Sequence, residues 1–210
     1  MSESINPEDY IKVILLGESG VGKTNLINVS QGKEFDYNSM TSLSSSYSNG
    51  TLVYKDKEYF YVLWDTAGQE SYRSLNKIFM KNSKVIIFVF SLDNKRSFDE
   101  LDYWIDNAKN EVGIDCVMGI AGNKCDLIKE QVVNEADAEK YADDHGMKIR
   151  FTSALNNPYG FKSYLNELII DYINFDKNDD IKDKKKKEVV VLKTGNKENK
   201  NKNKNKKRKC

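Results

Sequence analysis

Several short apolar runs recur along the chain, each with few polar positions. YIKVILL at residues 10–16, VIIFVF at 85–90 and CVMGIA at 116–121 are apolar at nearly every position. A strand that is buried on both faces, as in a parallel sheet, has this near-continuous pattern. The three runs therefore predict central strands of a parallel sheet, and a shorter strand is predicted at 148–152.

Amphipathic stretches separate these runs. Their apolar positions recur with helical spacing at residues 22–31, 97–110, 135–145 and 160–174, which predicts four helices. The alternation of strand and helix is typical of an α/β fold built from βαβ units.

Residues 51–64, TLVYKDKEYFYVLW, have a different pattern. They predict two strands around a tight turn at Lys55-Asp56-Lys57, which would add one antiparallel hairpin to the sheet.

The length and composition fit one folded domain. The chain has 210 residues, of which 39% are hydrophobic and 31% charged, with only two Pro, which excludes collagen-like, proline-rich and wholly disordered proteins. We predict a short N-terminal extension at 1–8, a domain at 9–176 and a tail at 177–210. No apolar run reaches 18 residues and the N-terminus lacks a signal-peptide pattern, so neither secretion nor a membrane span is expected.

The small net charge of +1 hides a strong asymmetry. From Lys184 to Cys210 the chain has 13 Lys or Arg residues and two acids, whereas 20 basic and 30 acidic residues precede them. Like charges interleaved with Asn leave little to bury, so this basic tail is predicted to be disordered. Such tails usually bind a polyanion, either nucleic acid or an anionic lipid surface.

Three cysteines are too few for a disulfide or zinc framework. Cys116, Cys125 and Cys210 are also poorly spaced for one, which indicates a reducing compartment and a cytoplasmic protein.

A glycine-rich segment follows the first apolar run. It reads Gly17-Glu18-Ser19-Gly20-Val21-Gly22-Lys23-Thr24, the pattern GxxxxGK[ST], between a predicted strand and a predicted helix. Glycines let backbone N–H groups converge on phosphate oxygens, and the following helix adds its positive end. Lys23 would reach the outer phosphates and the Thr24 hydroxyl would ligate Mg²⁺. These eight residues therefore predict a phosphate-binding loop.

Two further motifs follow predicted strands, Trp64-Asp65-Thr66-Ala67-Gly68-Gln69-Glu70 and Asn123-Lys124-Cys125-Asp126. Asp65 can hold a Mg²⁺-bound water, and Gly68 can offer its N–H to a terminal phosphate. Asp126 can accept two hydrogen bonds from the N1–H and exocyclic amine of guanine, a donor pair that adenine lacks. In this order after a phosphate loop, the motifs predict a guanine nucleotide site.

At these residues the chain resembles the Ras-like small GTPases, and within them the Rab family. WDTAGQE, the loop form GESGVGKT and Ser71-Tyr72-Arg73-Ser74-Leu75 are similar to Rab sequences more than to Ras, Rho or Arf. The resemblance covers roughly residues 9–175. It implies a P-loop NTPase G domain of the α/β class, a six-stranded, mostly parallel sheet with one antiparallel hairpin and five flanking helices.

The resemblance also assigns roles to single residues. Phe35 stands where the family places an aromatic ring against the guanine, so the guanine-binding set is Phe35, Asn123, Lys124, Asp126, Ser153, Ala154 and Leu155. Ser42 stands where the family has a Thr that binds Mg²⁺ and senses the γ-phosphate. Thr41 precedes it and either hydroxyl could serve, with the spacing favouring Ser42.

Three positions depart from the family pattern. Leu155 stands where a Lys is usual, while Ser44 and Asn82 each replace a typical Gly. Because Ser44 lies in the segment SLSSSYSNG of the first switch loop, we expect effector recognition through this loop to be unlike that of well-known Rabs.

Hydrolysis of GTP needs positive charge at the phosphates and a residue that orients the attacking water. Lys23 with Mg²⁺ supplies the charge, and Gln69 takes the second role by position. No Arg lies in the phosphate loop, so turnover is expected to be slow without an activating protein. Loss of the γ-phosphate would relax two switch loops, which include Thr41, Ser42, Ala67, Gly68, Gln69, Glu70 and Tyr72.

The leading hypothesis is an enzyme that acts as a timed GTP switch in vesicle traffic. Its expected partners are an exchange factor, an activating protein, effectors, and escort or GDP-dissociation-inhibitor proteins. One alternative is a docking module that binds GTP and hardly hydrolyses it, which the altered first switch loop favours. Another is a Ran-like carrier with a nucleic-acid-binding tail. A terminal cysteine is not needed for such a tail, so no nucleic-acid partner is expected.

Cys210 ends the chain behind Lys206-Lys207-Arg208-Lys209 and lacks the residues that complete a CaaX box. The resemblance implies a single geranylgeranyl group there, with an unmodified thiol as the alternative. One lipid chain is a marginal anchor, but each nearby basic residue adds about 1 kcal/mol at an anionic surface. The expected location is the cytosolic face of endomembranes or vesicles.

Overall fold

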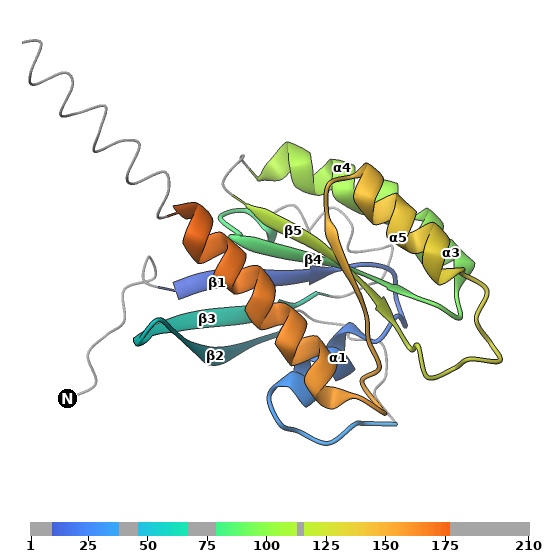
Figure 1. Cartoon of the computed structure of the whole chain (residues 1–210), viewed down its shortest axis with the longest axis horizontal. Helices are drawn as coiled ribbons and strands as arrows, with labels where there is room; N and C mark the ends of the chain where they lie inside the picture. Colours follow the sequence, from blue (N-terminus) through green and yellow to red (C-terminus); the bar gives the residue numbers. More distant parts are fainter. Residues whose placement is uncertain (1–9, 38–45, 67–78, 113–115, 177–210) are drawn as a thin grey trace, which may run out of the picture. The chain divides into compact units, whose positions relative to one another are not determined.

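The computed structural model describes residues 10–37, 46–66, 79–112 and 116–176. Its strands are β1 (Tyr10–Leu16), β2 (Ser46–Tyr54), β3 (Lys57–Asp65), β4 (Val85–Ser91), β5 (Val117–Asn123) and β6 (Lys148–Phe151). They form one sheet in the order β2-β3-β1-β4-β5-β6 (Figure 1). Within the described sheet, β2 and β3 are antiparallel and every other pair is parallel. The predicted six-stranded, mostly parallel sheet with one hairpin is confirmed.

The central strands are apolar because helices cover both sheet faces. Every residue of β4 is buried, and alternate side chains point to opposite faces. Ile14, Ile86 and Phe88 belong to a buried cluster with helical residues on one face. Val13 and Leu15, which are also fully buried, therefore point to the other face.

The helices are α1 (Lys23–Ser30), α3 (Lys95–Asp99), α4 (Leu101–Glu111), α5 (Glu135–Asp144) and a last helix at residues 158–176. Figure 1 shows α3, α4 and α5 on one side of the sheet, and α1 with residues 158–172 of the last helix, in orange, on the other. On α4 the buried residues recur at the three- and four-residue spacing of an amphipathic helix, namely Leu101, Trp104, Ile105 and Ala108.

The helix predicted at 97–110 is two consecutive helices. Asn94 starts α3, where its side chain accepts a hydrogen bond from the Ser97 N–H. Glu100 then separates α3 from α4 because its backbone, at φ −82° and ψ 0°, leaves the ideal helical range.

The hairpin of β2 and β3 closes through a two-residue turn. Lys55 and Asp56 both have positive φ, 51° and 59°, as the type I′ turns that suit hairpins require. β2 begins at Ser46, earlier than the predicted residue 51. The polar sequence SYSNG has little strand propensity, but it pairs in register with β3, Ser46 opposite Asp65 and Gly50 opposite Tyr61.

Asn82 occupies a left-handed backbone position, with φ 62°. The family's usual Gly suits such a position, and Asn tolerates it better than most other residues do. This departure from the family pattern is therefore compatible with the same local turn.

The chain divides into two units, Met1–Tyr172 and Ile173–Cys210, and the sheet belongs to the first. The predicted extension, domain and tail boundaries stay predictions. Within the described ranges, no helix combines the length and apolar character that a bilayer span requires.

Candidate functional site

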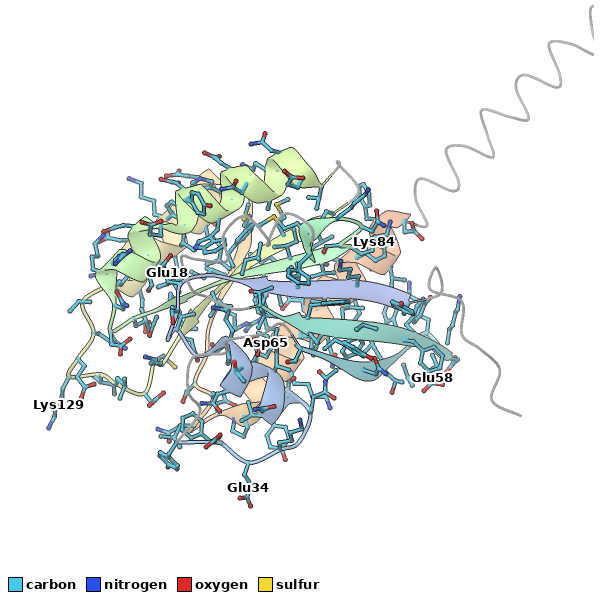
Figure 2. The ribbon with its side chains drawn as sticks, turned by 180° about the vertical axis from the view of Figure 1, so that it is seen from behind. Glu18, Glu34, Glu58, Asp65, Lys84 and Lys129 are labelled. Atoms are coloured by element: carbon cyan, nitrogen blue, oxygen red, sulfur yellow. The ribbon has the colours of Figure 1, made fainter. Side chains whose placement is uncertain are left out.

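The carboxyl ends of β1, β3 and β5 meet at one edge of the sheet. Figure 2 shows Glu18 and Asp65 on this side and Glu58 and Lys84 towards the opposite ends of the strands. A cavity of about 350 Å³ opens at this edge. The predicted residues that line it are Ser19, Gly20, Gly22, Lys23, Thr24, Phe35, Asn123, Lys124, Asp126, Ala154 and Leu155.

Two glycines let the phosphate loop approach its neighbours closely. Gly17 has φ 148°, and a Cβ there would collide with the Val89 carbonyl oxygen of β4. Gly22 has φ 96°, and its Cβ would collide with the Asn123 amide nitrogen. Both positions therefore exclude side chains by backbone angle and by space.

Lys23 is 5% exposed and anchors the loop from inside. Its Nζ donates hydrogen bonds to the carbonyl oxygens of Gly17 and Glu18, both at 2.8 Å. Burial lowers the pKa of Lys23 from 10.5 to about 8, although the charges of Asp65 and Glu18 oppose the shift. A phosphate anion in the loop would raise this pKa again, because nearby negative charge favours the ammonium form.

Thr24 and Asp65 place two oxygen atoms side by side. The Thr24 hydroxyl donates to Asp65 Oδ2 at 2.8 Å, and Asp65, at the end of β3, is 3% exposed. Hydroxyl and carboxylate oxygens are the hard ligands that Mg²⁺ prefers. The following residue is fixed by a 2.7 Å hydrogen bond from the Thr66 hydroxyl to the Leu15 carbonyl. The residues present therefore fit a magnesium site.

Asn123 connects the base motif to the phosphate loop. It is 1% exposed, and its Nδ2 donates to the Val21 carbonyl at 2.8 Å. Its Oδ1 accepts from the Thr152 hydroxyl at 3.2 Å. Both ends of the amide thus hold neighbouring segments together, and direct contact of Asn123 with guanine stays a prediction.

Lys124 is held in a left-handed conformation, with φ 60°. Its Nζ lies 3.2 Å from Asp93 Oδ2. Burial alone would raise the pKa of Asp93, but the hydrogen bond from Ser91 and the charge of Lys124 together lower it. This ion pair, which the sequence motif did not predict, holds the Lys124 ammonium beside Asp93, and Lys124 also lines the cavity.

The segment after β6 contributes Ala154 and Leu155 to the lining of the cavity. Ser153 Oγ accepts a hydrogen bond from the Asn156 N–H at 2.8 Å, and Ala154 is buried. Leu155 is 39% exposed at the cavity edge. The structure thus places Ala154 and Leu155 in the lining of the cavity and Ser153 directly before them, and contact of these residues with guanine stays a prediction.

Phe35 is half-buried, which distinguishes it from a core residue. Its ring meets that of Tyr37 edge to face, with centroids 4.9 Å apart. Both aromatic residues line the cavity. Phe35 is thus placed where a planar ligand in the cavity could contact its ring.

The family model that matches the chain is that of the Ras family, over residues 12–174. The chain belongs to the Ras family. It is 35% identical over 147 residues to Ras-related protein Rab-22A of Canis lupus familiaris, a match that covers 70% of this chain and 75% of the relative. It is 31% identical over 164 residues to Ras-related protein Rab11A of Lotus japonicus, a match that covers 76% of this chain and 73% of the relative. It is 33% identical over 152 residues to Ras-related protein Rab-10 of Caenorhabditis elegans, a match that covers 72% of this chain and 76% of the relative.

These relatives confirm the prediction of a Rab-type, Ras-like small GTPase. The protein is therefore an enzyme that binds guanine nucleotides and hydrolyses GTP.

Further residues of this Ras-family site were not predicted individually from the sequence. The cavity is also lined by Asn25, Asp36, Tyr37, Thr66 and Leu127. Thr66 stands inside the WDTAGQE motif, and Asn25 is a polar residue directly after GKT, so both could have been found. Asp36 and Tyr37 belong to none of the sequence motifs, and they reach the cavity only because of the path that the chain takes after α1.

Several predicted residues fall in the parts of the chain without a described structure. Ser42 and Thr41, the candidate Mg²⁺ ligands of the first switch loop, lie outside the described residues, as do Ala67, Gly68, Gln69, Glu70, Tyr72 and Cys210. Their roles stay predictions.

We expect GDP binding to take up protons at alkaline pH. Free Lys23, with a pKa of about 8, loses its proton above that pH, whereas the phosphate-bound ammonium keeps it. Linkage then predicts a larger proton uptake at pH 9 than at pH 7.5, with affinity falling as the pH rises. Isothermal titration calorimetry in buffers of different ionisation enthalpy measures the uptake.

As the control, the titration is repeated in EDTA, which removes Mg²⁺. The proton uptake should stay the same, because it is expected to arise from Lys23 and the phosphates. Equal uptake at the two pH values would contradict the lowered pKa.

Proposed function

We propose that this small GTPase is a Mg²⁺-dependent switch with slow intrinsic hydrolysis that acts in membrane traffic. The observation that supports it is that residues of the phosphate loop, Thr24 and Asp126 line one cavity, while the Thr24 hydroxyl donates to Asp65. The curated relatives are named as Rab proteins. By this likeness the expected partners are an exchange factor, an activating protein, effectors, and escort or GDP-dissociation-inhibitor proteins.

In this proposal Thr24 and Ser42 ligate Mg²⁺, and Asp65 holds it through a water. The ion, when bound, supplies positive charge to the β- and γ-phosphates. Lys23 binds the outer phosphates from the inner side of the loop, where its buried ammonium already faces two carbonyl oxygens. Gln69 orients the water that attacks the γ-phosphate. Phe35 and Asp126 hold the base.

We expect Asp126→Ala to abolish the preference for guanine. The carboxylate makes two charge-assisted hydrogen bonds to guanine, so their loss should weaken GDP binding by roughly 10²- to 10⁴-fold. The weak affinity for ADP should stay unchanged, because ADP does not offer that donor pair. Competition against labelled GDP measures both affinities.

Asp143→Ala, which removes an exposed carboxylate from α5, serves as the matched control and should bind GDP like the wild type. Similar affinities of the wild-type protein for GDP and ADP would overturn the guanine reading of the base motif.

We expect Gln69→Leu to slow GTP hydrolysis by roughly 10- to 100-fold while nucleotide affinity stays the same, because the amide orients water but makes no ground-state contact. Single-turnover hydrolysis of GTP in the presence of Mg²⁺ measures the rate. Gln31→Leu, at the end of α1 and outside the cavity lining, is the control. Equal rates for Gln69→Leu and wild type would favour the alternative of a docking module that hardly uses hydrolysis.

We expect Cys210→Ser to leave nucleotide binding intact and to move the protein from membranes to the soluble fraction of cells. The reason is that the proposed anchor needs both a geranylgeranyl group and the basic tail. Wild-type protein should resist extraction by high salt and yield to detergent. Cys116→Ser, a change at a half-buried thiol next to β5, should stay on membranes.

Intact-mass measurement of wild-type protein from cells completes this test. A mass without a lipid adduct, together with unaltered membrane recovery of Cys210→Ser, would refute the anchor. Release by nuclease in place of detergent would favour the nucleic-acid-binding tail.

A further inference from the structure

Asn25 lies directly after Thr24 in α1 and is 7% exposed. Its Nδ2 donates a hydrogen bond to the Asp36 carbonyl at 3.1 Å. Its Oδ1 accepts one from the Asp36 N–H at 3.2 Å. One side-chain amide therefore pairs with both backbone groups of a single residue, in the way that one strand pairs with the next.

These two hydrogen bonds attach the segment after α1 to the helix. Asp36 itself is exposed, so burial of its side chain does not hold it in place. A backbone hydrogen bond from the Lys33 N–H to the Asn28 carbonyl, at 3.0 Å, ties down the start of the segment. Asn25 attaches the part of the segment that follows.

The attached residue stands between the two aromatic residues of the cavity. Phe35 precedes Asp36 and Tyr37 follows it, and their rings contact each other edge to face. Both line the cavity, whereas the Asn25 amide fixes the backbone between them. Displacement of Asp36 from Asn25 would therefore displace both rings from the cavity edge.

We propose that Asn25 is a positioning residue that controls how long guanine nucleotide stays bound. Its amide latches the Phe35–Tyr37 segment onto α1 and thereby keeps the Phe35 ring against the base. GDP leaves when the latch opens. The inference rests on the proposed role of Phe35 as a base contact, and it adds the residue through which the helix after the phosphate loop governs that contact.

The test is the release rate of radiolabelled GDP, chased with unlabelled GDP, from full-length wild type, Asn25→Ala, Phe35→Leu and the double variant. Loss of two partly buried hydrogen bonds should speed release from Asn25→Ala by roughly tenfold. Phe35→Leu should also release GDP faster. Because Asn25 acts through Phe35, the double variant should be no faster than Phe35→Leu alone. A merely structural role of Asn25 predicts additive effects.

Asn28→Ala is the matched control, since it removes another α1 asparagine whose Oδ1 contacts Lys33 and not Asp36. Its release rate should equal that of the wild type. Asn25→Ser is the milder second variant, because its short hydroxyl cannot replace both hydrogen bonds, and it should also release GDP faster. It keeps the test valid if Asn25→Ala folds poorly by circular dichroism.

The outcomes separate the two proposals. Unchanged release from Phe35→Leu would overturn the base contact and with it the latch. Faster release from Phe35→Leu but unchanged release from both Asn25 variants would overturn the latch alone. Additive acceleration in the double variant would also overturn it, because Asn25 would then act independently of Phe35.

Discussion

The hydrogen bond from the Asn123 amide to the Val21 carbonyl spans 102 positions of sequence and joins the two halves of the site. On one side is the phosphate loop, whose Gly22 leaves room for the amide. On the other side are β5, the Lys124 turn and, through the Thr152 hydroxyl, the segment after β6. A buried amide without partners costs about 1–3 kcal/mol, so the paired arrangement is strongly favoured. The spacing between the phosphate and base walls of the cavity follows from this contact.

The phosphate loop holds the positive charge of Lys23 in a buried position, where a charge is energetically unfavourable. The Lys23 ammonium is nearly fully buried, and the carbonyls of Gly17 and Glu18 only partly replace its hydration. An anionic ligand relieves this cost, so part of the affinity for phosphate is prepared by the fold itself. The Thr24 and Asp65 pair similarly brings together a hydroxyl and a carboxylate that would hold a magnesium ion.

The sequence predicted those parts of the fold that depend on local pattern. The apolar run at 85–90 became most of β4, and Gly17–Gly22 became the turn between β1 and α1, because buried runs and glycine-rich turns have distinctive residues. The start of β2 was missed, since SYSNG gains strand structure only by pairing with β3. The split at Glu100 was missed for a related reason, because helix periodicity continues across it.

The same division holds for the site. Motif residues such as Lys23 and Asp126 came to one cavity as expected. The bonds of Asn25 to Asp36 and of Lys124 to Asp93 were not foreseen, because neither pair shares a motif. The path of a loop decides which residues meet in such pairs, and no short pattern encodes that path.

The cavity is lined by segments that are far apart in the sequence, so non-covalent contacts hold its walls together. A ligand that fills the cavity therefore acts as an additional core, and at a thousand times its dissociation constant it stabilises the native state by about 4 kcal/mol. A chain without nucleotide would lack this stabilisation and would unfold more often, and the unfolded state is the one that cellular proteases attack.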